Sequence, residues 1–333
     1  MSHIFLNGDM MKILVSIVVS ILFICSSISA DSYCVMSGED GNIIEEKDMH
    51  KQQSVASISK IMTAIIVIEN GNLYDTWKCS DAIDKAYGSM LYLKKGQEVS
   101  VEMLLYGLLL RSGNDAAVEL AHHESGSIEA FVDRMNKKAK DIGMLNTVFK
   151  NPSGLDEEDG GNLSTAYDMA ILMRYAIQNP VFVKISSSKY YKTKENGTWK
   201  NKNRLLFEYP FTISGKTGFT KKAGRTLVSA ASYNDMHSIV VTLNKGDDFA
   251  FHEEKHTAFL NDYKNLEVLE KGTYRILGRN YTVDEAISMN LKKDTKEQIE
   301  TFSYIDKKKL YVEVLQKGNE QVFSYMAGKG VRK

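Results

Sequence analysis

Apolar residues follow a helical spacing over the middle part of this chain. From Ser57 to Asn70 the apolar side chains recur every three or four positions, and Asn70-Gly71 supplies a stop, which predicts an amphipathic helix. A very apolar stretch over 101–110 predicts another helix that breaks at Ser112-Gly113 and resumes afterwards. The same criteria predict helices over 115–122, 128–142, 164–178 and 252–263.

Both ends of this helical region are flanked by strand-like segments. Two short apolar runs, 33–36 and 43–44, enclose a Gly/Asp/Asn cluster and predict a β-hairpin. A second hairpin is predicted from 226–232 and 238–243, which enclose a tight Asn234-Asp235 turn. Hairpins at each end with helices between them favour an antiparallel sheet whose first and last strands meet.

The chain divides into three predicted regions. Residues 1–30 contain Met11-Lys12, an apolar run over 13–24 and a small-residue exit, which is typical of a secretory signal peptide. A membrane span needs about 20 apolar residues, and this run is shorter. An uncleaved anchor or a lipid-modified Cys25 is the alternative, and membrane contact is expected only if this segment is not cleaved. Residues 31–263 form the predicted main domain, and the lysine-rich residues 264–333 a small β-rich one.

Composition and charge exclude several classes of partner. The 333 residues include 42 basic and 42 acidic ones, with no long run of one sign, so no nucleic-acid partner is expected. Cys34 and Cys79 are too few for a disulfide framework and are expected to be free thiols. Neither cysteine has a Cys or His partner at metal-ligand spacing, and His122-His123 is an isolated pair, so no metal site is expected.

Ser57 and Lys60 form a Ser-x-x-Lys pair at the start of a predicted helix. One helical turn places the hydroxyl and the amine on the same face. A serine hydroxyl needs a base to become a nucleophile, and a lysine desolvated by apolar neighbours can serve. Ser186 and Lys189 share the spacing, but no apolar helical face follows them.

Two further short patterns offer polar groups to a cleft. Ser112 and Asn114 lie at the predicted helix break, where a hydroxyl and an amide can pass a proton and hold a substrate amide. Lys216 and Thr217 precede the second hairpin and can bind a carboxylate from a strand edge. Gly218 then leaves room for a substrate backbone.

Taken in order, the three patterns resemble those of the low-molecular-weight serine D-Ala-D-Ala carboxypeptidases, a family of penicillin-binding proteins. The resemblance extends from about residue 33 to residue 260 and includes Gly154-Leu155-Asp156. It implies an α+β fold: a β-lactamase/transpeptidase-like domain, with an antiparallel sheet, flanking helices and a helical subdomain, followed by the small C-terminal β-rich domain.

The resemblance also implies a role for each site residue. Ser57 would be the acylated nucleophile, Lys60 its base, and Ser112 with Lys216 a proton relay to the leaving amine. Asn114 would hold the substrate amide, and the N–H groups of Ser57 and Phe219 would stabilise the oxyanion. The remaining substrate-binding residues are Lys216, Thr217 and Gly218, with Lys202, Arg204 and Lys245 open as further carboxylate ligands.

The implied substrates are peptidoglycan stem peptides outside the cytoplasm, and β-lactam antibiotics would acylate Ser57 as covalent inhibitors. No cofactor is implied. A β-lactamase or esterase on the same scaffold, or a non-catalytic cell-wall peptide-binding protein, remains an alternative. Residues 157–162 lack the Glu-x-x-Leu-Asn element of class A β-lactamases, which favours the carboxypeptidase. Residues 326–333 have too little apolar surface for a membrane-lying helix.

Overall fold

The structure is a computed structural model that describes residues 31–156, 161–193, 197–293, 299–307, 309–316 and 321–331. The predicted signal peptide and most of the loop compared with class A β-lactamases lie outside these residues. Ser32–Lys333 forms one compact unit, and the following description concerns that unit.

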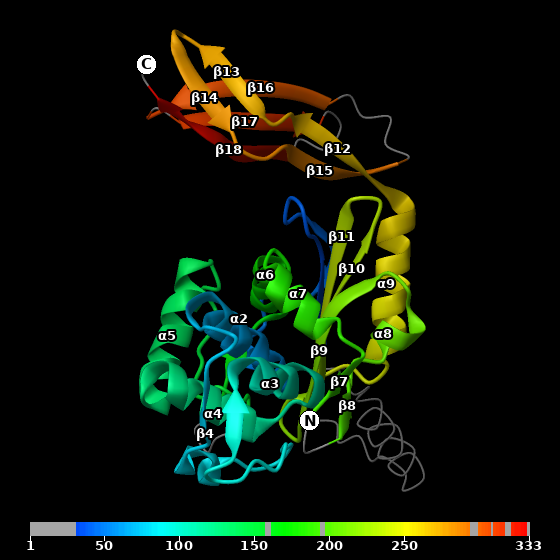
Figure 1. Ribbon diagram of the computed structural model, residues 1–333. Helices are drawn as coiled ribbons and strands as arrows, with labels where there is room; N and C mark the ends of the chain where they lie inside the picture. The colour runs from blue at the N-terminus through cyan, green and yellow to red at the C-terminus, as the bar shows by residue number, and fades with distance from the viewer. Residues whose placement is uncertain are drawn as a thin grey trace, which may run out of the picture. The chain divides into compact units, whose positions relative to one another are not determined.

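A five-stranded antiparallel sheet is the centre of the fold (Figure 1). The chain's first hairpin and its later strands form it together, because β1 pairs with β11 from Ser32↔Leu243 to Ser37↔Ser238. The predicted meeting of the first and last strands is therefore confirmed. The strand order is β2 (Ile43–Lys47), β1 (Ser32–Ser37), β11 (Met236–Leu243), β10 (Gly224–Tyr233) and β9 (Thr212–Thr220).

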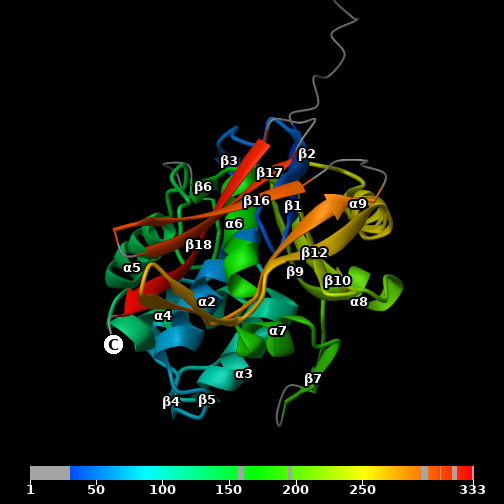
Figure 2. The same ribbon diagram turned by 90° about the horizontal axis from the view of Figure 1, so that it is seen from above.

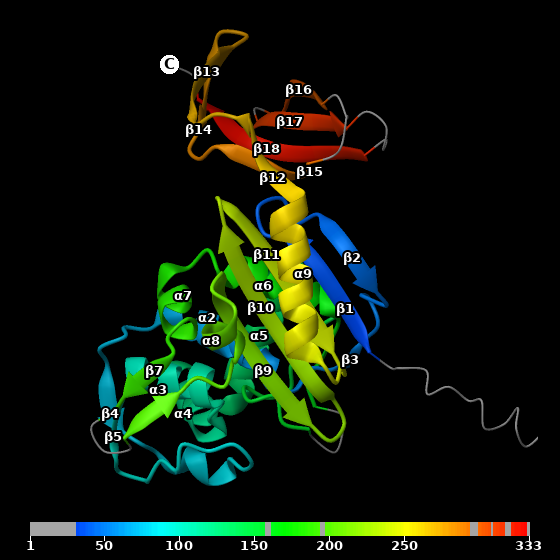
Figure 3. The same ribbon diagram turned by 90° about the vertical axis from the view of Figure 1, so that its right-hand side faces the viewer.

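Helices cover both faces of this sheet, as Figure 3 shows with α9 (Asp248–Asp262) crossing one face. On the other face α2 (Lys60–Asn70) is the central helix, buried from Lys60 to Val67. Around it lie α3 (Val101–Tyr106), the π-helical turn η3 (Gly107–Arg111), α4 (Asn114–Ser125), α5 (Ile128–Asp141), α6 (Ala166–Ala176) and α7 (Pro180–Ser186). The remaining short elements are η1 (Ala56–Ser59), η2 (Asp81–Lys85), α8 (Leu205–Glu208), and the strand pairs β3–β6 (Gln53–Ser54, Leu163–Ser164), β4–β5 (Thr76–Lys78, Glu98–Ser100) and β7–β8 (Tyr190–Lys192, Thr198–Lys200).

The predicted helices are all present, with shifted ends. The helix predicted from residue 164 begins at Ala166, because Thr165 caps it by accepting a hydrogen bond from the Asp168 N–H. The last helix begins at Asp248 rather than at residue 252. The break predicted at Ser112-Gly113 is confirmed, since η3 ends at Arg111 and α4 starts at Asn114.

The C-terminal region is built from strands, as expected. Its sheet has the order β13 (Gly272–Ile276), β14 (Arg279–Val283), β18 (Gln321–Val331), β17 (Lys309–Gln316) and β16 (Ile299–Asp306), and the last three strands are seen in Figure 2. A separate ribbon pairs β12 (Tyr263–Leu269) with β15 (Ile287–Lys292). The region has apolar clusters of its own, around Met289 and Tyr281. The exact domain boundary stays a prediction.

Cys34 and Cys79 are both buried and free, as the sequence predicts. Burial raises the pKa of each thiol to about 12. Among the described residues, no helix has the length and apolar character needed to cross a membrane.

Candidate active site

Ser57 lies on a strained turn at the entrance to the central helix. The turn η1 contains it, and Ala56 just before it is buried with φ +49°, a left-handed conformation that costs free energy for a residue with a side chain. The neighbouring Gly154 (φ +77°) packs so closely that a Cβ on it would lie 2.0 Å from the Ala56 carbonyl oxygen. The loop at Gly154 is therefore fitted against the backbone beside Ser57.

Lys60 occupies a fully buried position one turn after Ser57. Its Nζ lies 2.9 Å from Ser57 Oγ and 2.7 Å from Asn114 Oδ1, and it also donates to the Ser153 carbonyl. Burial is the main cause that holds the pKa of Lys60 well below its usual value, and the charges of Lys216 and Lys202 act in the same direction. A neutral amine within hydrogen-bonding distance of a serine hydroxyl can take its proton.

A second lysine–serine pair faces the first across the site. Lys216 Nζ donates to Ser112 Oγ at 3.0 Å, and burial with the charge of Lys202 lowers the pKa of Lys216 to about 7. Ser112 adopts φ +65° at the helix break. A Cβ on Gly113 would lie 2.6 Å from Leu91 Cγ, so glycine suits this position. The break brings the Ser112 hydroxyl to Lys216.

Strand β9 brings the Lys-Thr-Gly segment against the start of the central helix. Its residues continue the β9–β10 ladder, with Lys216 opposite Val228 and Gly218 opposite Thr226. A Cβ on Gly218 would lie 2.9 Å from the Ser57 nitrogen and 2.4 Å from Thr226 Oγ1. The strand reaches the Ser57 N–H only because residue 218 has no side chain.

These residues surround a cavity of about 300 Å³. Ser57, Ser112, Thr217, Gly218 and Phe219 line it, whereas Lys60 and Lys216 lie beneath the surface, and Phe219 is 67% exposed. The other lining residues are Ser89, Lys202, Arg225, Asp248 and Phe249.

Among the three cations left open by the sequence, only Lys202 lines this cavity. Its Nζ donates to Ser89 Oγ at 3.4 Å, and burial lowers the pKa of Lys202. Arg204 pairs instead with Glu208, and Lys245 lies over the Phe251 ring. The cavity therefore has a cation beside the hydroxyls of Ser112 and Thr217.

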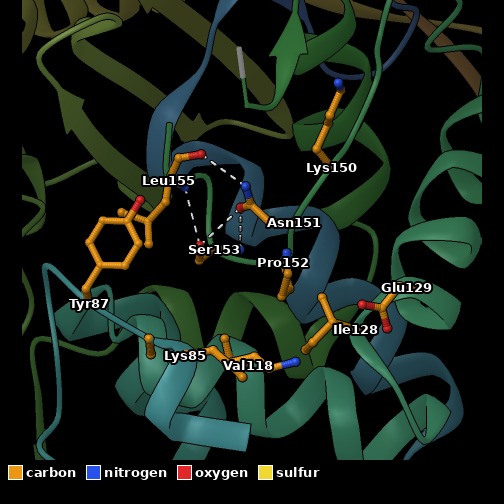
Figure 4. Close-up of a pocket in the computed structure, with 11 residues that line it drawn as sticks. Lys85, Tyr87, Val118, Ile128, Glu129, Lys150, Asn151, Pro152, Ser153 and Leu155 are labelled. Atoms are coloured by element: carbon orange, nitrogen blue, oxygen red, sulfur yellow. Dashed lines mark hydrogen bonds between the residues drawn. The ribbon is translucent and has the colours of Figure 1, made fainter. Parts of the chain in front are cut away.

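A larger cavity of about 680 Å³ lies behind the loop at Ser153 (Figure 4). Asn151 organises this loop by accepting hydrogen bonds from the Ser153 and Gly154 N–H groups and donating to the Leu155 carbonyl. Among the described residues, the one serine that lines the larger cavity is Ser153, whose hydroxyl donates to Asn151 Oδ1 and contacts no lysine amine. We therefore place the chemistry in the smaller cavity.

Two groups that act on Lys60 received no role from the sequence patterns. The Ser153 carbonyl accepts from Lys60, and its only sequence signal is the nearby Gly154. The buried Asp115 carboxylate accepts the N–H groups of Leu91 and Leu93, which holds the segment beside Gly113. Asp115 also acts on Lys60, where its charge opposes the fall in pKa.

The competing Ser-x-x-Lys pair does not form a site. Ser186 Oγ lies 2.7 Å from Ser214 Oγ in the interior, and Lys189 Nζ lies over the Phe207 ring. In the described part of the chain, no three His, Cys, Asp or Glu side chains gather where a metal ion could bind.

Solved structures identify the class to which this fold belongs. Penicillin binding protein 5 from Haemophilus influenzae matches with a TM-score of 0.77 at 24% identity, over 92% of this chain and 98% of that one. The D-alanyl-D-alanine carboxypeptidase DacD from Francisella tularensis matches with a TM-score of 0.71 at 25% identity, over 91% and 94%. The fold is the transpeptidase fold of these penicillin-binding proteins, with a strand-rich C-terminal region, as the resemblance implied.

The sequence comparisons narrow this class to one family. A family model described as D-alanyl-D-alanine carboxypeptidase matches residues 21–247. The D-alanyl-D-alanine carboxypeptidase DacF of Bacillus subtilis is 33% identical over 287 residues, which are 79% of this chain and 73% of that protein. DacB2 of Mycobacterium tuberculosis, with the same enzyme name, is 33% identical over 64% of this chain and 74% of its own length. This chain belongs to the D-alanyl-D-alanine carboxypeptidase family.

Proposed function

We propose that the chain is a serine-type D-alanyl-D-alanine carboxypeptidase that removes the terminal D-alanine from peptidoglycan stem peptides through an acyl-enzyme on Ser57. The observation that carries this proposal is the buried Lys60 amine, 2.9 Å from Ser57 Oγ at the wall of a cavity. Family membership supports the substrate class, and penicillins would acylate the same hydroxyl.

Acylation begins with proton transfer from Ser57 to the neutral Lys60. Ser57 Oγ attacks the carbonyl carbon between the two D-alanines, and the negative charge on the carbonyl oxygen is stabilised by the N–H groups of Ser57 and Phe219. The close packing of Gly218 against the Ser57 nitrogen supports this assignment, because it brings β9 to the position where a second donor is needed.

Collapse of the tetrahedral intermediate breaks the C–N bond and forms the ester. The leaving nitrogen takes its proton from the Ser112 hydroxyl, which is replenished from Lys216 at 3.0 Å. The proton that Lys60 took from Ser57 then passes to Lys216, which returns both lysines to their starting states. Water attacks the ester, the neutral Lys60 takes its proton, and that proton returns to Ser57 Oγ as the acyl bond breaks. Atoms balance as one water consumed and one D-alanine released for each turnover.

Asn114, Lys216, Thr217 and Lys202 would orient the substrate. One Asn114 Nδ2 hydrogen goes to the Tyr87 carbonyl at 2.5 Å, and the amide's second hydrogen is assigned to the substrate. The terminal carboxylate would bind Lys216 and Thr217. Lys202 is added to this carboxylate site because it alone of the three open cations lines the cavity.

The proposal includes export. Peptidoglycan lies outside the cytoplasm, and residues 1–30 have the pattern of a signal peptide, so we propose an extracytoplasmic enzyme whose leader is cleaved. Membrane contact through the N-terminal segment would follow only where that cleavage fails.

The test combines covalent labelling with product release. Wild type is expected to form a stable adduct with fluorescent penicillin and to release D-alanine from a diacyl-Lys-D-Ala-D-Ala peptide, whereas Ser57→Ala should do neither. Ser186→Ala is the matched control, because this buried serine has the same Ser-x-x-Lys spacing. Mass spectrometry should find the penicilloyl group on the peptide containing Ser57. Rapid nitrocefin turnover without D-alanine release would refute the carboxypeptidase proposal.

A further inference from the structure

The hairpin between β13 and β14 has a leucine at its apex. Leu277 and Gly278 form a two-residue turn, closed by the pair Ile276↔Arg279, and both have positive φ, +49° and +74°. Positive φ at both positions defines the type I′ turn, which prefers Asn, Asp or Gly. Leu277 is also 89% exposed, the highest value for a large apolar side chain among the residues whose exposure the structure describes.

The β10–β11 hairpin of the same chain uses ordinary turn chemistry, whereas Lys307 at the β16–β17 turn also has a positive φ, +45°. The β10–β11 hairpin has a two-residue turn of the same kind, where Asn234 and Asp235 have φ +51° and +58°. Leu277 therefore departs from a rule that this protein follows at an equivalent turn. A bulky residue in the left-handed region costs free energy that asparagine largely avoids.

Another exposed residue with positive φ has a structural reason for this conformation. Tyr92 has φ +63°, but it lies between Leu91 and Leu93, whose N–H groups both donate to the buried Asp115 carboxylate. That clamp accounts for the conformation of Tyr92. Leu277 has no hydrogen-bonding clamp of this kind among the described contacts, and its side chain lies in solvent. A local rule broken without a structural gain points to a function.

Basic residues gather at the end of the sheet that bears this apex. The register places Asn280 opposite Val331 and Lys309 opposite Lys329, so the β13–β14 turn and the β16–β17 turn lie at the same end of the sheet (Figure 1). Among the side chains that the structure describes, this end has four basic ones and one acidic one, and no ion pair between described residues involves them; they are Arg275, Arg279, Lys307, Lys309 and Asp306.

We infer that the apex of the β13–β14 hairpin inserts Leu277 into an anionic lipid surface, with the surrounding cations bound to the headgroups. An apolar apex gains free energy by leaving water for the acyl region, and each nearby Lys or Arg gains from the negative surface potential. An anionic polymer would match the cations but would leave Leu277 unused. One leucine and a few cations predict weak, reversible binding that salt reduces.

The first test measures vesicle partition of the exported protein, with the N-terminus of each variant confirmed to be the same. Wild type is expected to bind phosphatidylglycerol vesicles better than phosphatidylcholine vesicles, and less at high salt. Leu277→Asn should lower this partition about tenfold. Because asparagine suits the type I′ turn, the variant should unfold at the same or a higher temperature and should keep its rate of penicillin acylation.

Leu145 provides the matched control, since it is a leucine that is 78% exposed at a different surface. Leu145→Asn removes the same apolar area and should leave vesicle binding unchanged. In Arg275→Gln/Arg279→Gln, partition should fall roughly tenfold at low salt and less at high salt. Equal partition of wild type and Leu277→Asn would overturn the inference.

A second measurement reports insertion directly, whatever else binds the membrane. Tryptophan fluorescence of Leu277→Trp should be quenched by brominated phosphatidylglycerol beyond the level of Leu145→Trp. Equal quenching of the two variants would contradict insertion. A different outcome is that wild type and Leu277→Asn are retained equally by an immobilised anionic polysaccharide while neither binds vesicles. That result would assign the cations to a polymer and would also overturn the inference.

Discussion

Replacing Gly218 by alanine tests the approach of strand β9 to Ser57. The added Cβ would lie 2.9 Å from the Ser57 nitrogen and 3.1 Å from the Ile58 nitrogen, whereas ordinary contacts begin at 3.4 Å. The separation from the Ser57 nitrogen is therefore short by about half an ångström, and both neighbours are backbone atoms that cannot turn aside. Either the strand or the helix entrance must move.

Two effects of different size are expected from this change. Overpacking in a close-packed region typically costs about 1–3 kcal/mol of stability. Displacing one donor of an oxyanion site typically lowers the rate about 10²–10³-fold. Gly218→Ala should therefore fold, with a lower melting temperature, and should be acylated by fluorescent penicillin at least about a hundredfold more slowly under single-turnover conditions.

The contact with Thr226 provides a way to separate these effects. The same Cβ would lie 2.4 Å from Thr226 Oγ1, a clash that Thr226→Ala removes at the cost of the hydrogen bond to the Val55 carbonyl. If the slow acylation of Gly218→Ala is caused by the Cβ contact with the Ser57 nitrogen, the double variant Gly218→Ala/Thr226→Ala should be acylated just as slowly. Gly246→Ala, where no atom lies within 4 Å of the added Cβ, controls for the change to alanine. Normal acylation by folded Gly218→Ala would refute the reasoning.

Two further predictions concern buried cationic and imidazole groups. Lys202→Met should raise the pKa values of Lys60 and Lys216, because the charge of Lys202 lowers both. The acidic limb of the pH profile for acylation should then move to higher pH. The acylation rate should fall roughly two- to threefold at pH 7 and recover near pH 9. An acidic limb at the wild-type pH would contradict this prediction. His252 and His256 are buried, and burial lowers the pKa of His256 to about 3 and that of His252 well below its usual value. Because the pKa of both histidines is lowered in the folded state, the unfolded chain binds more protons below pH 6.5. The stability present above that pH should therefore be lost on acidification, by about 2.4 kcal/mol between pH 6 and pH 5. Urea unfolding at both pH values measures this, and an equal loss in His252→Gln/His256→Gln would show that other groups cause it.

The origin of the buried histidines' pKa values shows the limit of sequence patterns. Ser229 Oγ contacts His252 Nδ1 at 2.6 Å and His256 Nε2 at 2.7 Å, between β10 and α9. The two histidines are about one helical turn apart in the sequence, and both lie in the helix predicted over 252–263. Their lowered pKa values arise from burial against the sheet, and burial depends on the packing of distant segments.

Several parts of the fold and site were predictable because they depend on local order in the chain. Apolar runs and turn residues predicted both hairpins, and the helical spacing after Ser57 predicted a helix that presents Lys60 beside the hydroxyl. Such features follow from side-chain direction and backbone preference over a few residues. The three short patterns in order also identified the family that the comparisons confirm.

Other features required the tertiary structure. Ser57 and Ser186 begin the same four-residue pattern, and they differ in what packing places beside them: Lys60, Asn114 and a cavity for one, Ser214 in the interior for the other. The Ser153 carbonyl has no residue-type signature, because every residue has that group. Lys202 was one of three open cations until the structure placed it in the cavity. Spacing along the chain determined which groups could react, whereas desolvation and distance between segments far apart in sequence determined which ones are placed to do so.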